Sequence, residues 1–171
     1  MFEGLAANQS QTYRLMTTRM ITPPALEEGD TIGLVAPARS VKPDELESAI
    51  RIIENWGLWV VAGENLYKNH HQFAGTDQER ASDLQQMMDD DHIKAIICVR
   101  GGYGTVRTLQ LLDFHYYSRH PKWIVGFSDI TVLHSYINHH LHIKTLHAQM
   151  PLNFPKDGAA SPSTELLKNV L

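Results

Sequence analysis

The sequence predicts an α/β fold: an open, doubly wound parallel sheet of about five strands with helices on both faces. Short apolar runs rich in β-branched residues alternate with segments whose apolar residues recur at helical spacing. The run at residues 94–99 is apolar on both faces, which is typical of a central parallel strand. A chain of 171 residues, 43% hydrophobic and 20% charged, is large enough for one domain with a real core.

Turn residues set the limits of the expected strands. The first strand follows a Glu-Gly-Asp turn and is closed by Pro37, and the fourth begins at Trp123 and stops at the small residue Gly126. The five expected strands lie at residues 31–36, 58–61, 94–99, 123–126 and 143–146.

Helix signals separate these strands. Pro43 fits a first helical turn, Gly57 ends that segment, and Thr76 and Glu79 have capping-box spacing. Residues 113–122 read as a loop. The expected helices run from 43 to Gly57 and at 76–88, 105–112, 128–140 and 164–171. The alternation predicts a flavodoxin- or Rossmann-like sheet, in which ligands bind at the carboxyl ends of the strands.

Composition excludes several classes of function. A net charge of -4, with no run of basic residues, argues against a nucleic-acid partner. Cys98 is the single cysteine, so no intrachain disulfide or thiolate metal cluster is expected. Residues 1–20 lack the apolar core of a signal peptide and are expected to form a flexible arm outside the fold. No segment has membrane-spanning length, so we expect a cytoplasmic protein with no membrane partner.

Ser128 lies where the fourth strand gives way to a helix. In one interpretation it is a helix N-cap, whose Oγ accepts from the Thr131 NH. In the other it is a nucleophile, because side chains at this edge of a parallel sheet lie over a helix N-terminus that favours a developing oxyanion. The local Gly-Phe-Ser-Asp pattern lacks the final glycine of the Gly-x-Ser-x-Gly elbow.

A second candidate element is the turn after the third strand, Arg100-Gly101-Gly102-Tyr103-Gly104. Its glycines allow positive φ angles and bring NH groups close to an anion. The turn could be a tight connection only, could hold a phosphate or carboxylate, or could donate to an oxyanion. It is neither a Walker loop nor a G-x-G-x-x-G dinucleotide motif.

Metal sites are not expected. The histidines at 134, 139, 140 and 142 fall on different faces of a helix end, and the acidic residues 89–91 read as a solvated turn. His147 follows the fifth strand and should reach the same sheet edge as Ser128. The helix carries His134 away from that hydroxyl.

Four segments together resemble the LD-carboxypeptidases of serine peptidase family S66. They are the opening strand at 29–37, the Phe-Ala-Gly-Thr-Asp-Gln-Glu-Arg-Ala run at 73–81, the strand and glycine-rich turn at 96–104, and Gly-Phe-Ser-Asp-Ile-Thr at 126–131. Their order and intervals match as well, so the resemblance covers residues 21–171. Members of this family cleave the L,D-bond of murein tetrapeptides in cell-wall recycling, and relatives confer immunity to microcin-type peptide nucleotides.

The resemblance assigns roles to single residues. It implies that Ser128 is the nucleophile and that the NH groups of Gly102 and Asp129 form the oxyanion hole. We also expect Arg100, Gly101 and Tyr103 on the substrate-binding side, and the resemblance implies neither a metal nor an organic cofactor.

One departure from the family is evident, because its members carry a C-terminal domain that supplies the glutamate and histidine of a Ser-His-Glu triad. We expect that domain to be absent and 21–171 to be the nucleophile-bearing domain, weak or inactive alone. The uncovered interface should associate with that domain or with itself, with 151–155 the exposed segment. His147 is the one substitute base in the sequence. The alternatives are a non-catalytic peptide- or anion-binding module and a fragment whose motifs only preserve the fold.

Overall fold

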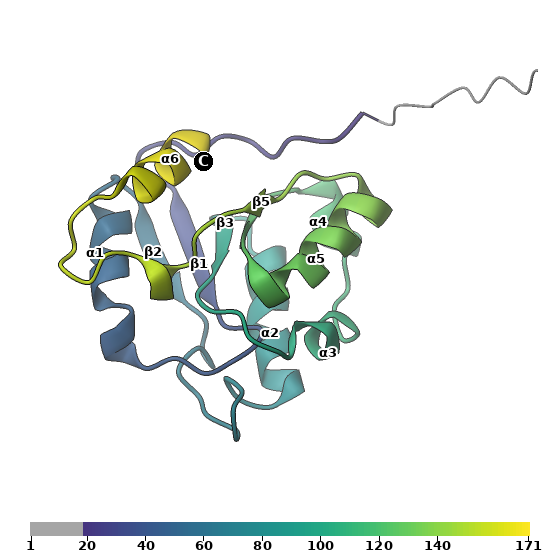
Figure 1. Cartoon of the computed structure of the whole chain (residues 1–171). Helices are drawn as coiled ribbons and strands as arrows, with labels where there is room; N and C mark the ends of the chain where they lie inside the picture. The colour runs from purple at the N-terminus through teal and green to yellow at the C-terminus, as the bar shows by residue number, and fades with distance from the viewer. Residues whose placement is uncertain (1–18) are drawn as a thin grey trace, which may run out of the picture.

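The computed structural model describes residues 19–171, so the arm predicted at 1–20 lies almost wholly outside the described residues. Five parallel strands form one sheet in the order β2-β1-β3-β4-β5 (Figure 1). Strand order reverses between β1 and β3, which makes their carboxyl ends the switch point of the sheet. The strands are β1 Thr31–Val35, β2 Trp59–Ala62, β3 Ile93–Cys98, β4 Trp123–Gly126 and β5 Leu146–His147. The predicted fold class is confirmed.

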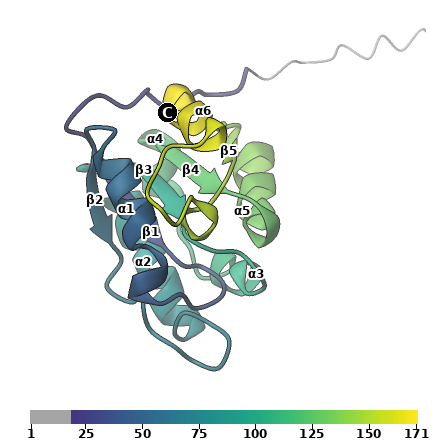
Figure 2. The same cartoon turned by 60° about the vertical axis from the view of Figure 1, so that its left-hand side comes forward.

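Helices cover both faces of the sheet, as a doubly wound fold requires. Figures 1 and 2 show α1 and α6 on one face and α2, α4 and α5 on the other. The α-helices are α1 Glu47–Glu54, α2 Asp77–Asp89, α3 Thr105–Leu109, α4 His115–Arg119, α5 Thr131–Tyr136 and α6 Pro162–Val170. Short 3₁₀ turns lie at Pro43–Glu45, Ser128–Ile130 and Pro151–Asn153, and a π-turn at Ile137–Leu141 continues α5. No helix within residues 19–171 is long and apolar enough to cross a membrane.

The core has two layers because the strands are apolar on both sides. Alternate residues of β3 point in opposite directions: Ile97 packs under α1 and α6, and Ile96 packs under α2 and α5. Both side chains are fully buried. Cys98 lies in the second layer, where burial raises the pKa of its thiol well above the usual range.

The capping box predicted for α2 is present. Thr76 Oγ1 accepts from the Glu79 NH at 3.2 Å, and the Thr76 NH donates to Glu79 Oε2 at 2.8 Å. Lys68 Nζ lies 2.8 Å from Glu79 Oε1. The hydrogen bonds from Lys68 and Thr76 lower the pKa of Glu79 to about 2.

Three expectations about local structure were wrong. Residues 115–119 form helix α4 inside the stretch expected to be a loop, because Phe114 and Tyr117 bury an apolar face. The fifth strand pairs with β4 through Leu146 and His147, rather than over 143–146.

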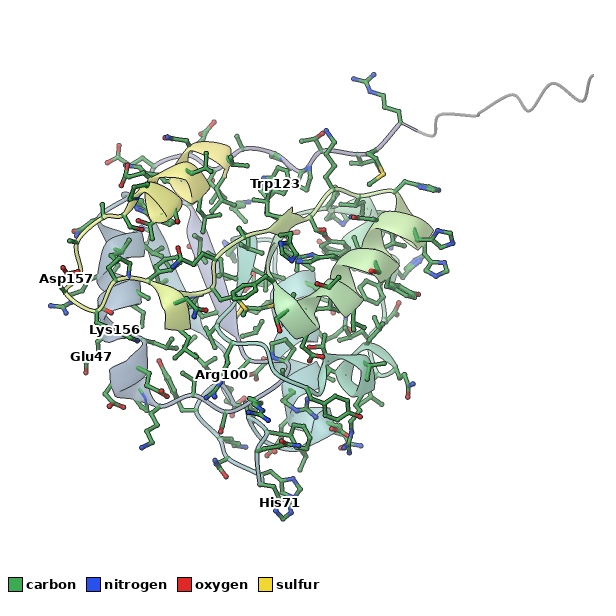
Figure 3. All side chains as sticks on the ribbon, viewed as in Figure 1. Glu47, His71, Arg100, Trp123, Lys156 and Asp157 are labelled. Carbon is green, nitrogen blue, oxygen red and sulfur yellow. The ribbon has the colours of Figure 1, made fainter. Side chains whose placement is uncertain are left out.

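The third wrong expectation concerns residues 151–155. Pro151 is buried, and Phe154 is 2% exposed in the layer under α1 and α6. Just beyond them, Lys156 Nζ donates to the Glu45 carbonyl at 2.9 Å, which holds this loop beside the start of α1 (Figure 3). The segment is therefore part of the fold rather than an open interface.

Candidate active site

Ser128 is the first residue of a tight turn that leaves the carboxyl end of β4. Its φ angle is 60°, a left-handed conformation that costs an L-residue about 1–2 kcal/mol. The residue is exposed, and its side chain makes no capping hydrogen bond to the helix that follows. The N-cap interpretation was therefore wrong. Strained conformations of this kind cluster at active sites.

The strand must end in glycine for this turn to form. A Cβ atom on Gly126 would lie 2.9 Å from both Cγ1 and Cγ2 of Ile130, closer than real contacts allow. Ile130 is fully buried and cannot move aside without opening the core. Gly126 thus lets the chain fold back sharply and present Ser128 at the sheet edge.

The glycine-rich turn after β3 lies directly against Ser128. Gly102 and Gly104 have φ angles of 120° and 134°, which only glycine adopts without strain. A Cβ on Gly101 would lie 3.3 Å from Ser128 Oγ and 3.4 Å from the backbone nitrogen of Asp129. The two elements singled out in the sequence therefore meet at the carboxyl ends of adjacent strands.

A side chain also joins the two turns. Asp129 Oδ2 accepts a hydrogen bond of 2.8 Å from the backbone NH of Thr105, the first residue of α3. Because Asp129 follows Ser128 and Thr105 follows Gly104, this bond fixes the separation of the two backbones.

A hollow of about 190 Å³ opens beside Ser128. Arg100 lines it and donates from Nη1 to the Ser40 carbonyl at 2.7 Å. Figure 3 shows Arg100 and Trp123, the first residue of β4, at opposite ends of the sheet. The full lining is Arg39, Arg100, Gly101, Gly102, Phe127, Ser128, Met150 and Asn153.

Some predicted site residues are not in this hollow. Tyr103 is 48% exposed and lies 6.2 Å from Phe73 between ring centroids, outside the lining. His147 is exposed on β5, opposite Gly126 in register, with its ring centroid 6.2 Å from that of Phe127. Its place beside the end of β4 agrees with the predicted sheet edge.

His134 contacts the backbone at the end of β4. Its ring points back from α5 to the end of β4, where Nε2 lies 2.9 Å from the Gly126 carbonyl. The side chain is 6% exposed, and burial lowers the pKa of its imidazole. Among residues 19–171, neither His134 nor His147 hydrogen-bonds to Ser128 Oγ.

Arg39 is a site residue that the sequence analysis missed. A Cβ on Gly102 would lie 2.6 Å from Arg39 Cδ, so this side chain packs across the glycine-rich turn. Arg39 follows β1, the strand beside β3 at the switch point of the sheet. The rule that ligands bind at that point could have identified it.

Arg80 was also missed, although it lies within the 73–81 motif. It is 2% exposed, and its Nη1 donates to the Pro37 carbonyl at 2.6 Å and to Thr108 Oγ1 at 3.2 Å. Its Nη2 contacts Asp77, and the guanidinium carbon lies 4.7 Å from the centroid of the Phe73 ring. Arg80 thereby ties the end of β1 to α2 and α3 beneath the glycine-rich turn.

A larger hollow, of about 580 Å³, lies away from Ser128. Its lining includes Asp30, Asp91 and Lys122, from segments at the amino ends of the strands. The carboxyl groups of residues 89–91 are on exposed residues, as a solvated turn predicts. Within the described part of the chain no three His, Cys, Asp or Glu side chains are grouped to hold a metal ion.

Comparisons with known proteins show which family the chain resembles. Residues 32–148 match the peptidase S66 family description "LD-carboxypeptidase N-terminal domain". A probable murein peptide carboxypeptidase of Bacillus subtilis is 42% identical over 128 residues, which are 75% of this chain and 40% of that protein. The Escherichia coli microcin C7 self-immunity protein MccF is 30% identical over 111 residues, 63% of this chain and 32% of that protein.

A solved structure supports the fold. The MccF-like protein of Bacillus anthracis superposes with a TM-score of 0.80 and 24% identity, covering 88% of this chain and 47% of that one. The chain thus spans less than half the length of these relatives. It belongs to the LD-carboxypeptidase family and matches that family's N-terminal domain.

Proposed function

We propose that this chain is the nucleophile-bearing domain of a serine LD-carboxypeptidase that hydrolyses murein peptides. One observation carries the proposal: an exposed serine, held in a left-handed conformation at the end of a parallel strand, lies against a glycine-rich turn. The 42% identity to a probable murein peptide carboxypeptidase supports the substrate class.

The chemistry proposed is acyl transfer through a covalent ester. Ser128 Oγ loses its proton to a general base and attacks the scissile carbonyl, whose oxygen becomes an oxyanion. The NH groups of Gly102 and Asp129 donate to that oxygen, and Gly101 leaves room for it beside the hydroxyl. The C–N bond then breaks, the leaving amine takes the proton, and water hydrolyses the ester to regenerate Ser128.

The general base is proposed to come from outside the described residues. No hydrogen bond within 19–171 joins Ser128 Oγ to a histidine or a carboxylate. The family resemblance implies a glutamate and a histidine on a C-terminal domain, and the relatives are long enough to carry one. We therefore expect this chain alone to hydrolyse peptides slowly or not at all.

The test joins this chain to the remaining C-terminal part of the Bacillus subtilis relative and measures release of the terminal D-amino acid from a murein tetrapeptide. Activity should appear in the joined protein and disappear in Ser128→Ala. Ser135→Ala, an exposed serine on α5, is the matched control and should keep full activity. Hydrolysis that survives Ser128→Ala would overturn the proposal.

The isolated chain gives a second test of the same proposal. Full activity of residues 1–171 alone would contradict an external base. If that activity were lost in His147→Ala, His147 would be the base, since it lies beside the end of β4.

Two other functions compete with this one. The MccF relative favours hydrolysis of microcin-type peptide nucleotides, and faster cleavage of an aspartyl sulfamoyl adenosine than of the tetrapeptide would support it. A non-catalytic peptide- or anion-binding module is favoured because, within residues 19–171, no base is hydrogen-bonded to Ser128. It would bind the tetrapeptide yet stay inactive when joined to the C-terminal part.

A further inference from the structure

The hollow beside Ser128 carries positive charge that no ion pair within residues 19–171 neutralises. Arg39 and Arg100 are its charged lining residues. The ion pairs found within residues 19–171 involve Lys68, Arg80 and Arg107 instead. The nearby Asp129 carboxylate is engaged by the Thr105 NH.

The guanidinium groups of Arg39 and Arg100 differ in how freely they can reorient. Arg100 is half-buried and anchored by its 2.7 Å bond to the Ser40 carbonyl. Arg39 is exposed, and its Nη2 lies 3.4 Å from Gln72 Oε1, a long and weak hydrogen bond. The guanidinium of Arg39 can therefore turn its N–H donors toward a ligand at little cost in free energy.

Arg39 and Ser128 flank the same pair of glycines. A Cβ on Gly102 would lie 3.0 Å from Arg39 Nε, and a Cβ on Gly101 would lie 3.3 Å from Ser128 Oγ. Adjacent Cα atoms are only about 3.8 Å apart. The cation and the hydroxyl are thus close enough to contact one short ligand.

A carboxypeptidase substrate presents an anion close to the bond that is cleaved. The carboxylate carbon of a C-terminal residue is three bonds from the scissile carbonyl carbon, about 3–4 Å away. Arginine binds a carboxylate through two parallel N–H donors. This arrangement neutralises the charge of the carboxylate and sets its orientation.

We propose that Arg39, supported by Arg100, binds the C-terminal carboxylate of the peptide and selects substrates with a free C-terminus. This subsite rests on the proposed function, because it positions the last peptide bond over Ser128. Phe127, Met150 and Asn153 complete the lining and carry no charge to oppose the carboxylate.

The test measures binding by the 171-residue chain, with calorimetry on two ligands. One is a tetrapeptide ending in D-alanine as the free acid, and the other is its C-terminal amide. The acid should bind about ten- to a hundredfold more tightly, the usual effect of a hydrogen-bonded charge. Arg39→Gln should remove this preference, and Arg39→Lys should keep part of it. Arg51→Gln, an exposed arginine on α1, should leave it unchanged.

Three outcomes would overturn the subsite: equal binding of acid and amide, an acid preference that survives Arg39→Gln, or no binding of the acid at millimolar concentration. These outcomes are separate from failure of the proposed function. The binding measurement needs no turnover, so an acid preference would persist in Ser128→Ala even if Ser128 were not the nucleophile. Conversely, loss of the subsite would leave hydrolysis by the joined protein dependent on Ser128.

Discussion

Asp129 Oδ2 accepts a 2.8 Å hydrogen bond from the backbone NH of Thr105, which joins the turn after β4 to the turn after β3. The bond also satisfies a free NH at the start of α3, where a carboxylate is favoured by the helix dipole. The side chain of Asp129 thus holds in place the backbone whose NH groups are proposed to bind the oxyanion.

Replacing Asp129 with alanine should weaken both the fold and the reaction. We expect the free energy of unfolding to fall by about 1–2 kcal/mol, as for loss of a helix cap. Asp129→Asn keeps an acceptor oxygen and should lose less. Urea unfolding of the chain gives the stabilities, and turnover by the joined protein gives the rates. An alanine variant as stable and active as the wild type would show that the bond is dispensable.

Ser128 offers a test of stored strain. At a φ angle of 60°, glycine is free of the steric cost that alanine bears. Ser128→Gly should therefore be more stable than Ser128→Ala by about 1 kcal/mol, and both should lack hydrolysis in the joined protein. Thermal unfolding of the two variants checks the order. Equal stabilities, or a more stable alanine variant, would argue that the turn relaxes.

Arg80 should be essential to the stability of the site. Arg80 is 2% exposed, and methionine would remove its bonds to the buried Pro37 carbonyl and to Asp77, which is partly exposed and keeps its ion pair with Arg107. The Pro37 carbonyl still accepts a hydrogen bond from Thr108 Oγ1 at 3.0 Å, which limits the loss of stability. We expect Arg80→Met to lower the free energy of unfolding, measured in urea, by about 2–4 kcal/mol. Lys68→Met, which removes an exposed ion pair, should cost little. Similar losses in the two variants would contradict this account.

Much of the fold could be predicted because local signals agree with the tertiary structure. The β-branched runs become strands, of which β1, β3 and β4 are buried, and the Thr76–Glu79 box begins α2 where expected. Helix α4 was missed because its five residues are too few for a periodic pattern to be seen. Phe154 was misplaced because 151–155 was expected to lie at an uncovered domain interface, whereas Phe154 packs in the layer under α1 and α6.

The two turns of the candidate site were predictable because motifs marked them. Ser128 and the glycine-rich turn stand out in the sequence, and the parallel topology brings them together. Arg39 and Arg80 come from other strands and helices, so their convergence depends on tertiary packing that spacing alone does not encode. The turn of His134 back to the Gly126 carbonyl likewise depends on how closely α5 packs against the strand.

His134 should make the stability of the chain depend on pH. With its proton on Nε2 the ring donates to the Gly126 carbonyl, which also accepts from the Ala148 NH at 3.1 Å. Nδ1 is buried, and within residues 19–171 it has no partner, so protonation would bury a charge and an unpaired donor. Burial accordingly lowers the pKa of His134 from 6.5, although the hydrogen bond to Gly126 acts against it. The exposed His147 ring on β5, with its centroid 6.0 Å away, also lowers this pKa.

The sign of the pH effect follows from this lowered pKa. Between the folded pKa of His134 and 6.5, the unfolded chain binds more protons than the folded one. The stabilising contribution of His134 is therefore fully present above pH 6.5 and declines as pH falls below it, by at most about 1.4 kcal/mol per pH unit.

His134→Gln keeps a donor for Gly126 but cannot titrate. Urea unfolding at about pH 7.5 and about pH 5 should show a smaller loss in this variant than in the wild type. His147→Gln, which alters only the exposed neighbour, should retain most of the wild-type dependence. Parallel pH profiles for His134→Gln and the wild type would show that this buried imidazole does not govern the acid sensitivity of the domain.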